Sequence, residues 1–188
     1  MGRLTLILGG ARSGKSHFAQ QLAQACSDEE QRSIVYIATA EAGDEHMRQR
    51  IKRHRQGRPV GWETVEAPQD VAAAIEIAGG SAAVIIVDCL TLLISNLLLA
   101  GGEEFSENEA QVTSKEEAIL DEVQALIRAA REANAQVMVV SNEVGMGIVP
   151  LTRLGRIFRD IAGRANQALA QAADEVYVLW AGLPQRLK

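Results

Sequence analysis

The octapeptide "GGARSGKS", Gly9–Ser16, decides the fold that this sequence predicts. It fits the pattern G-x-x-x-x-G-K-[ST], and it lies between a strand-like run, "RLTLIL", and a helical run, "HFAQQLAQAC". In that context glycines let backbone N–H groups face phosphate oxygens, and the helix N-terminus adds positive potential. Lys15, as a catalytic residue, would neutralise charge on the transferred phosphates, and Ser16 would ligate Mg²⁺. Because pattern and context agree, we predict a phosphate loop rather than a chance glycine-rich turn, with these contacts: Gly9, Gly10, Ala11, Arg12, Ser13, Gly14, Lys15 and Ser16.

Outward from this loop, strand-like runs alternate with helical patterns along the chain. The patterns predict strands over residues 3–10, 33–40, 82–91, 135–144 and 174–184, and helices over 16–26, 44–56, 70–79, 114–134 and 153–173. Such alternation indicates a mostly parallel sheet with helices on both faces. We therefore predict an α/β P-loop NTPase fold of the RecA-like kind, as a single nucleotide-binding catalytic domain over residues 1–188. Residues 61–68 read as a short turn-bounded segment, and the acidic residues 100–111 as a loop.

Composition narrows the class of protein. The chain has 188 residues, 47 % of them hydrophobic and 23 % charged, which is typical of a soluble globular chain with a full core. The formal net charge of −5 argues against general nucleic-acid binding. No apolar run approaches the ~20 residues that a membrane span needs. Two cysteines, Cys26 and Cys89, lie far apart without metal-ligand spacing. We expect a cytoplasmic protein.

An acidic residue ends one of the buried strands. "VIIVD" supplies Asp88 at the carboxyl end of its strand, where an acid can bind Mg²⁺ directly or through water. The alternatives are a helix N-cap and a carboxylate in a structural salt bridge. With the phosphate loop, this residue predicts a nucleoside triphosphate and Mg²⁺, but folds of this kind carry out many reactions.

A basic stretch, "RIKRHRQGRP" over Arg50–Pro59, surrounds one histidine, His54, with cations in an acidic chain. If residues 44–56 form a helix, His54 points inward together with Met47 and Ile51. The same helical arithmetic places three cations on the outer side: Arg48, Lys52 and Arg55.

Neighbouring cations favour the neutral imidazole of His54, and a neutral imidazole is a nucleophile. The same cations would attract a triphosphate and offset charge as pyrophosphate leaves. On this hypothesis His54 attacks phosphorus and carries a phosphoryl-type group. The alternative is a partly buried histidine bonded to a backbone carbonyl, and composition and spacing alone favour that alternative.

Beyond these motifs, blocks along nearly the whole chain resemble one family, the bifunctional adenosylcobinamide kinases/adenosylcobinamide-phosphate guanylyltransferases of cobalamin biosynthesis. The shared blocks are "GGARSGKS", "YIATA", "EHMRQRIKRHRQGRP", "WETVEAP", "VDCLTLLISNLL", "VSNEVGMGIVP", "RIFRDIAGRANQALAQAADEVYVL" and "GLPQRLK". The resemblance implies that ATP or GTP phosphorylates adenosylcobinamide. It further implies that GTP guanylylates an enzyme histidine, and that adenosylcobinamide phosphate takes the GMP to give adenosylcobinamide-GDP.

The resemblance also assigns residues. The family histidine lies in R-I-x-x-H-x-x-x-R-P, which selects His54 rather than His46 and reverses the preference for a structural histidine. Glu66 and Asp88 are implied acidic nucleotide contacts, and which of them reads guanine and which serves the metal stays open. Ala40 stands where the family often has a hydroxyl residue. The remaining implied nucleotide contacts are Ala38, Thr39, Ala40, Arg55, Gln56, Gly57 and Arg58.

Two other readings of the sequence remain. One is a simple P-loop small-molecule kinase in which His54 is structural, and the other is a nucleotide-binding regulatory module with slow hydrolysis. Asn142 and Glu143 could line the active site, contact another subunit or form a turn, and Arg153, Arg156 and Arg159 are expected to be a solvated helix face rather than phosphate contacts. The resemblance suggests a homo-oligomer, such as a trimer.

Overall fold

The computed structural model describes residues 2–27, 33–41, 43, 45–101 and 108–188, and of residues 27, 46, 47, 50, 53 and 54 it describes the backbone only. Within these described ranges, seven strands form one sheet in the order β3-β2-β4-β5-β1-β6-β7. All neighbouring strands are parallel except the β6–β7 pair, which is antiparallel. The predicted mostly parallel sheet is confirmed. The strands are β1 (Arg3–Gly9), β2 (Ser33–Ala38), β3 (Glu63–Glu66), β4 (Ala82–Asp88), β5 (Gln136–Val140), β6 (Glu175–Trp180) and β7 (Leu183–Arg186).

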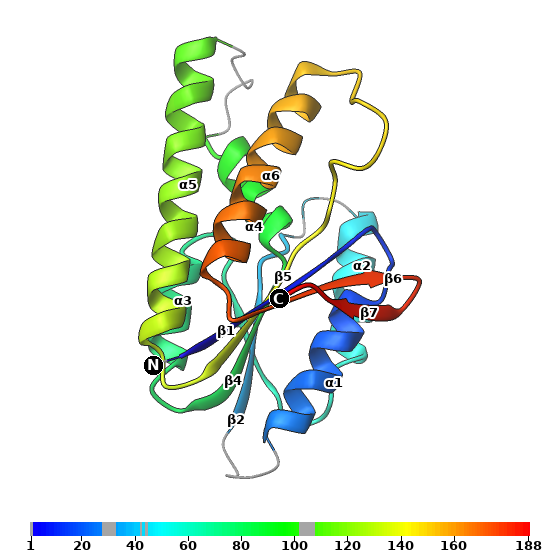
Figure 1. Cartoon of the computed structure of the whole chain (residues 1–188), viewed down its shortest axis with the longest axis vertical. Helices are drawn as coiled ribbons and strands as arrows, with labels where there is room; N and C mark the ends of the chain where they lie inside the picture. Colours follow the sequence, from blue (N-terminus) through cyan, green and yellow to red (C-terminus); the bar gives the residue numbers. More distant parts are fainter. Residues whose placement is uncertain (1, 28–32, 42, 44, 102–107) are drawn as a thin grey trace.

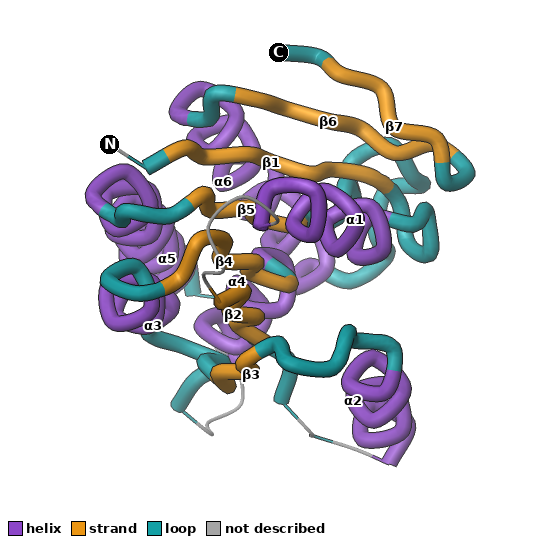
Figure 2. The backbone as a smooth tube through the Cα atoms, turned by 90° about the horizontal axis from the view of Figure 1, so that it is seen from below, coloured by secondary structure: helices purple, strands orange, loops and turns teal. Residues whose placement is uncertain are grey.

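Helices cover both faces of this sheet, as predicted. On one face α1 packs Ala19 and Ala23 into a cluster with Ile86 of β4 and Met138 of β5. On the other face α3, α4, α5 and α6 share a larger cluster with the same strands. Figure 2 shows α3 and α5 on the side of the sheet opposite α1, and α2 standing apart beside the β3 edge. The helices are α1 (Lys15–Ser27), α2 (Glu45–Gln56), α3 (Val71–Ala78), α4 (Leu90–Leu99), α5 (Glu109–Glu132) and α6 (Arg153–Ala172).

The central strands are buried on both faces because their apolar residues alternate between the two clusters. In β4, Ile85 and Val87 belong to the larger cluster, whereas Val84 and Ile86 belong to the α1 cluster. Successive side chains of a strand point to opposite faces, so a continuous apolar run fills both layers. None of the helices among the described residues is both long and apolar enough to cross a membrane.

Several element boundaries differ from the predictions. The apolar run that follows Asp88 forms the helix α4 and does not continue the strand. The last predicted strand, over residues 174–184, is divided by a turn at Ala181 and Gly182 into β6 and the antiparallel β7. The segment over residues 61–68 contains the short strand β3. This strand pairs in parallel with β2 and forms one edge of the sheet. The helix α5 begins at Glu109, after Asn108 caps it by accepting the Ala110 N–H, so part of the predicted acidic loop is helical, and residues 102–107 lie outside the described residues.

The strand register aligns the carboxyl ends of the parallel strands along one edge. Ala38 of β2 is the partner of both Glu66 of β3 and Asp88 of β4, and Asp88 is the partner of Val140 of β5. Val140 in turn pairs with Ile7 of β1, just before the predicted phosphate loop. Ligands of parallel α/β sheets bind outside this edge. In Figure 1 the start of α1 and the helix α2 lie on the same side of the molecule, at this edge.

Candidate active site

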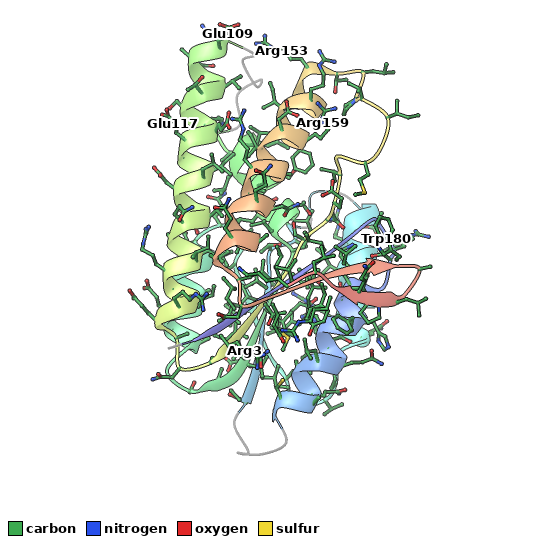
Figure 3. The ribbon with its side chains drawn as sticks, in the orientation of Figure 1. Arg3, Glu109, Glu117, Arg153, Arg159 and Trp180 are labelled. Carbon is green, nitrogen blue, oxygen red and sulfur yellow. The ribbon has the colours of Figure 1, made fainter. Side chains whose placement is uncertain are left out.

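The loop between β1 and α1 has the backbone that its glycines permit. Gly14 has φ 94°, and a Cβ built on it would lie 3.3 Å from the Cα of Gly182 in the β6–β7 turn. The Gly182 N–H donates a hydrogen bond to the Ser13 carbonyl at 2.9 Å. A side chain at Gly14 would therefore meet both left-handed backbone strain and a close neighbour. The hairpin formed by β6 and β7, near whose turn Trp180 is labelled in Figure 3, therefore packs against the phosphate loop.

Lys15 is buried at the first position of α1, and its Nζ donates a hydrogen bond to the Gly10 carbonyl at 2.6 Å. The ammonium group thus folds back across its own loop. Ser16, the next residue, lines the same cavity. A cation held over a loop of backbone N–H groups is suited to bind phosphate.

That cavity has a volume of about 620 Å³ and brings together residues from six separate parts of the chain. Most predicted site residues border it. They are Ala11, Arg12, Ser13, Gly14, Lys15, Ser16, Ala38, Ala40, Arg55, Arg58, Glu66 and Asp88. The cavity is concave, partly apolar and lined by several cations, which suits a nucleotide with its phosphates.

Not every predicted contact borders this cavity. Gly9 ends β1 and Gly10 begins the loop, and neither lines the cavity, while Gly57 is exposed in the turn after α2. Gln56 lines a neighbouring cavity of about 550 Å³. Thr39 is fully buried, and its Oγ1 both accepts the Cys89 N–H and donates to the Cys89 carbonyl, each at 2.8 Å. The Thr39 side chain therefore links β2 to β4 and does not face the cavity.

Arg55 corrects the prediction that it lies on the outer side of its helix. It forms an ion pair with Glu66 at the end of β3, and both residues line the cavity. The prediction took the side of α2 that carries Met47 and Ile51 as the side that faces the rest of the protein. Arg55 nevertheless contacts the end of β3, so part of the predicted outer side also faces the protein. Ile51 does line the cavity, as expected.

The helix that carries His54 is confirmed, because α2 spans Glu45–Gln56. Two described neighbours of His54, Ile51 one turn earlier and Arg55 directly after it, border the cavity. The His54 side chain and the whole His46 side chain lie outside the described residues. The inward direction of the imidazole therefore stays a prediction.

Asp88 lies at the end of β4 and accepts a hydrogen bond on Oδ2 from the hydroxyl of Tyr36. Burial, followed by the charge of Asp88, raises the pKa of Tyr36, so the phenol stays protonated and remains a donor. Sequence reasoning missed Tyr36, although it precedes Ala38 in the same strand and points to the same face. Its signal was a polar aromatic residue within an otherwise apolar strand, "SIVYIA".

Asn142 also borders the cavity, from the segment after β5. Its Nδ2 donates to Thr91 Oγ1 at 2.7 Å, and its carbonyl accepts a hydrogen bond from Asn166 of α6 at 3.2 Å. The Glu143 carboxylate accepts the Gly145 N–H at 2.6 Å, which is a local turn. Asn142 is thus a candidate site residue, whereas Glu143 is used in the backbone turn.

The basic face of α6 has structural partners. Arg156 donates to the carbonyls of Pro150 and Leu151, each at 2.9 Å, and Arg159 pairs with Asp160. Figure 3 shows Arg153 and Arg159 on the half of α6 that points away from the sheet. Arg153 is exposed, as a solvated face requires, whereas Arg156 and Arg159 are half-buried, and whether any of the three contacts phosphate stays a prediction.

The donor set fits Mg²⁺. Ser16 and Asp88 supply a hydroxyl and a carboxylate oxygen to the same cavity. Within the described part of the chain, no group of three or more His, Cys, Asp and Glu side chains could hold a metal ion. A site with few protein ligands is what Mg²⁺ uses when nucleotide phosphates and water complete its octahedron.

Two solved structures resemble this fold. The flagellar accessory protein FlaH from Methanocaldococcus jannaschii has a TM-score of 0.53 and 17 % sequence identity, covering 100 % of this chain and 78 % of that one. The KaiC-like protein PH0186 from Pyrococcus horikoshii OT3 has a TM-score of 0.50 and 15 % identity, covering 94 % and 70 %. At such low identity the likeness concerns the fold alone, and it confirms the predicted RecA-like P-loop architecture.

Sequence comparisons cover nearly the whole chain. The bifunctional adenosylcobalamin biosynthesis protein CobU of Escherichia coli (strain K12) is 44 % identical over 185 residues, 98 % of this chain and 99 % of the relative. CobU of Salmonella typhimurium is 44 % identical over 187 residues, again 98 % and 99 %. CobP of Pseudomonas aeruginosa is 40 % identical over 183 residues, 97 % and 96 %. Residues 5–187 match the family model described as cobinamide kinase / cobinamide phosphate guanyltransferase. The resemblance noted from the sequence is thereby confirmed, and the chain belongs to the cobinamide kinase / cobinamide phosphate guanyltransferase family.

Proposed function

We propose that this chain is a bifunctional transferase that phosphorylates adenosylcobinamide and then converts the product to adenosylcobinamide-GDP through a guanylyl group on His54. Family membership supports the two activities. The observation that carries the mechanism is that the phosphate loop and the end of α2 border one cavity. A histidine on α2 can therefore reach a nucleotide whose phosphates lie on the loop.

In the first reaction the substrate hydroxyl attacks the γ-phosphorus of ATP or GTP, and the nucleoside diphosphate leaves. Lys15 and the loop N–H groups would bind the β- and γ-phosphates. Ser16 and Asp88 would hold Mg²⁺, which when bound neutralises charge on the phosphate oxygens. The position of Lys15 supports its phosphate-binding role, because its Nζ lies over the loop and donates to the Gly10 carbonyl.

In the second reaction a ring nitrogen of His54 attacks the α-phosphorus of GTP, and pyrophosphate leaves. A phosphate oxygen of adenosylcobinamide phosphate then attacks the same phosphorus and releases the histidine. Arg55 and Arg58 border the cavity beside α2 and would offset charge on the transferred group. Splitting the transfer into two displacements is the usual benefit of a covalent intermediate.

We assign the metal role to Asp88 and the guanine role to Glu66. In the sheet order, β4 with Asp88 is separated from the phosphate-loop strand β1 by β5 alone, whereas β3 with Glu66 is the far edge strand. Glu66 lies against α2 through Arg55. A carboxylate can accept both N–H donors of the guanine edge, so this position suits base recognition.

The proposed function is tested by the products. The protein is incubated with adenosylcobinamide, GTP and Mg²⁺, and the corrinoids are identified by mass. We expect the mass of the phosphorylated compound first and that of its GMP conjugate later. If only the phosphorylated compound ever forms, the simple P-loop kinase is the better account. Nucleotide hydrolysis without any corrinoid product would favour the regulatory module.

Two further expectations belong with this function. A cytoplasmic location is consistent with both cysteines being free thiols, Cys26 exposed and Cys89 buried. The homo-oligomer suggested by the resemblance stays a prediction, and light scattering of the purified protein would test it.

A further inference from the structure

Tyr36 is buried in the sheet, with 2 % of the residue exposed, yet it borders the candidate site. It pairs in register with Ile86 of β4, so its side chain lies on the same face as Asp88, two positions further along that strand. Its hydroxyl donates to Asp88 Oδ2. Asp88 and Tyr36 both line the cavity that contains the phosphate loop. The hydroxyl therefore holds one oxygen of the carboxylate that we assign to the metal.

A face of the Tyr36 ring carries a cation from a different part of the chain, Arg58. The Arg58 Cζ lies 3.8 Å from the ring centroid, and Arg58 Nη1 donates to Thr64 Oγ1 at 2.9 Å. Arg58 Nε is buried and has no hydrogen-bond partner among the described residues. A guanidinium stacked on an aromatic face is oriented by it, and because Arg58 borders the cavity, its donors outside these contacts can bind an anion there.

One buried phenol thus contacts both sides of the cavity. It bonds the carboxylate at the end of β4 through its hydroxyl, and it supports the segment after α2 through its ring. A phenylalanine would fill the same volume and still stack with Arg58, but it would leave Asp88 Oδ2 without this donor. A purely structural aromatic residue does not require the hydroxyl.

We propose that Tyr36 is a positioning residue, whose hydroxyl orients Asp88 toward the magnesium of the bound nucleotide and whose ring orients Arg58 toward the phosphates. The inference rests on the metal role proposed above for Asp88. Its two parts can be measured separately. Removing the hydroxyl should change the Mg²⁺ dependence of nucleotide binding, and removing the ring should change nucleotide affinity in the absence of Mg²⁺.

The test measures binding and not turnover. The affinity of full-length protein for GTP with a fluorescent methylanthraniloyl group is measured in EDTA and over a series of Mg²⁺ concentrations. Tyr36→Phe should raise the Mg²⁺ concentration for half-maximal effect roughly tenfold, the size expected for losing a hydrogen bond to a charged group, with affinity in EDTA within about twofold. Tyr36→Leu should in addition weaken binding in EDTA, because Arg58 loses its platform.

Tyr177→Phe is the matched control, because it removes a hydroxyl from another strand tyrosine that packs edge-on against Phe18. It should change neither quantity, and thermal unfolding of all variants checks the fold. If Tyr36→Phe leaves the Mg²⁺ dependence unchanged while Asp88→Asn alters it, the role of Tyr36 is wrong and the metal role of Asp88 stands. If Asp88→Asn also leaves it unchanged, both assignments are overturned. Equal weakening with and without Mg²⁺ in Tyr36→Phe would likewise contradict the proposal.

Discussion

At the scale of single residues, the site contains charged groups that already have protein partners which a nucleotide would replace. Lys15 donates to the Gly10 carbonyl, and Glu66 pairs with Arg55. Such partners keep the charged groups near their working positions, and the exposed Glu66–Arg55 ion pair contributes only about 0–1 kcal/mol to stability. Substitutions at these residues should therefore affect chemistry more than stability.

The first prediction concerns Lys15. Lys15→Met keeps the volume of the side chain but removes the cation, so both the phosphorylation and the guanylylation rates should fall by about 10²–10³-fold. The free energy of unfolding should change by no more than about 1.5–3 kcal/mol, the value of one hydrogen bond that involves a charged group. Single-turnover rates and urea denaturation measure the two effects. A variant that lost kinase activity but guanylylated at the normal rate would show that the two reactions do not share the loop.

The second prediction concerns Glu66. Glu66→Gln keeps the shape of the side chain, but it replaces a carboxylate that accepts both guanine N–H donors with an amide that has one acceptor and one donor group. The kcat/KM of the guanylylation step for GTP should therefore fall about 10–100-fold. Phosphorylation with ATP should change little. Glu63→Gln, in the same strand and exposed, is the control. Equal losses with ATP and GTP would mean that Glu66 does not read the base.

At the scale of elements, polar side chains on the helices fix the loops that form the site. Asn166 of α6 is buried, accepts the Ser141 hydroxyl at 2.7 Å and donates to the Asn142 carbonyl. In α4, Asn96 Nδ2 donates to the Thr39 carbonyl at 2.8 Å and to the Pro68 carbonyl at 2.9 Å. These contacts attach the segments after β2, β3 and β5 to the helical layer.

The third prediction follows from Asn166. Asn166→Ala leaves a buried hydroxyl and a backbone carbonyl without partners, which should cost about 1–3 kcal/mol of unfolding free energy. Urea denaturation should show the loss, and nucleotide affinity should fall with it because Asn142 borders the cavity. Gln167→Ala, at the next and exposed position of α6, should change stability by less than about 0.5 kcal/mol. A neutral Asn166→Ala would contradict the positioning of this loop by α6.

What could be predicted from the sequence depended on local signals. The strand–loop–helix order around Gly9–Ser16, the helix α2 and the strand that contains Asp88 each have a motif or a period, and their presence was predicted correctly, although β4 ends three residues earlier than expected. The helix α4 was missed because a short apolar run cannot be distinguished from a buried strand by periodicity alone. The exposed strand β7 has no apolar alternation to reveal it. The Tyr36–Arg58 and Arg55–Glu66 contacts depend on how α2 approaches β3, which no local pattern determines.

At the scale of the whole molecule, one ionic cluster joins the ends of several elements at the edge opposite the site. Asp174 accepts the Leu4 N–H at 2.8 Å and pairs with Arg131 at 2.7 Å, and Arg131 also donates to the Ala172 carbonyl. The start of β1, the end of α5 and the end of α6 are thereby held together. Burial raises the pKa of Asp174, but the Leu4 N–H, Arg131 and Arg3 together lower it, so the net direction is downward.

The fourth prediction is the pH dependence of this cluster. Because the folded pKa lies below the unfolded value of about 3.9, the carboxylate stabilises the fold above that value, and the contribution disappears as pH falls through the folded pKa. Asp174→Asn should thus lower the unfolding free energy by about 0.5–1 kcal/mol at pH 7, a modest figure because the side chain is 39 % exposed. The difference from wild type should shrink between about pH 5 and pH 3.

Thermal unfolding across this pH range measures the difference. Asp121→Asn, on the exposed side of α5, is the matched control and should change the unfolding free energy at pH 7 by less than about 0.5 kcal/mol. A penalty for Asp174→Asn that stayed constant down to pH 3 would mean that packing, and not charge, accounts for the contribution of Asp174.

The guanylyl-histidine mechanism involves the whole enzyme, because it requires α2 and the phosphate loop to act on one nucleotide. The most direct test uses GTP labelled in the guanine ring, with Mg²⁺ and without cobinamide, followed by denaturation of the protein. We predict label on the wild type and on His46→Ala, lost in acid but stable in base, and no label on His54→Ala. If nucleotide binds but no protein is labelled, or if His54→Ala is labelled like the wild type, the guanylyl-histidine mechanism proposed here is contradicted.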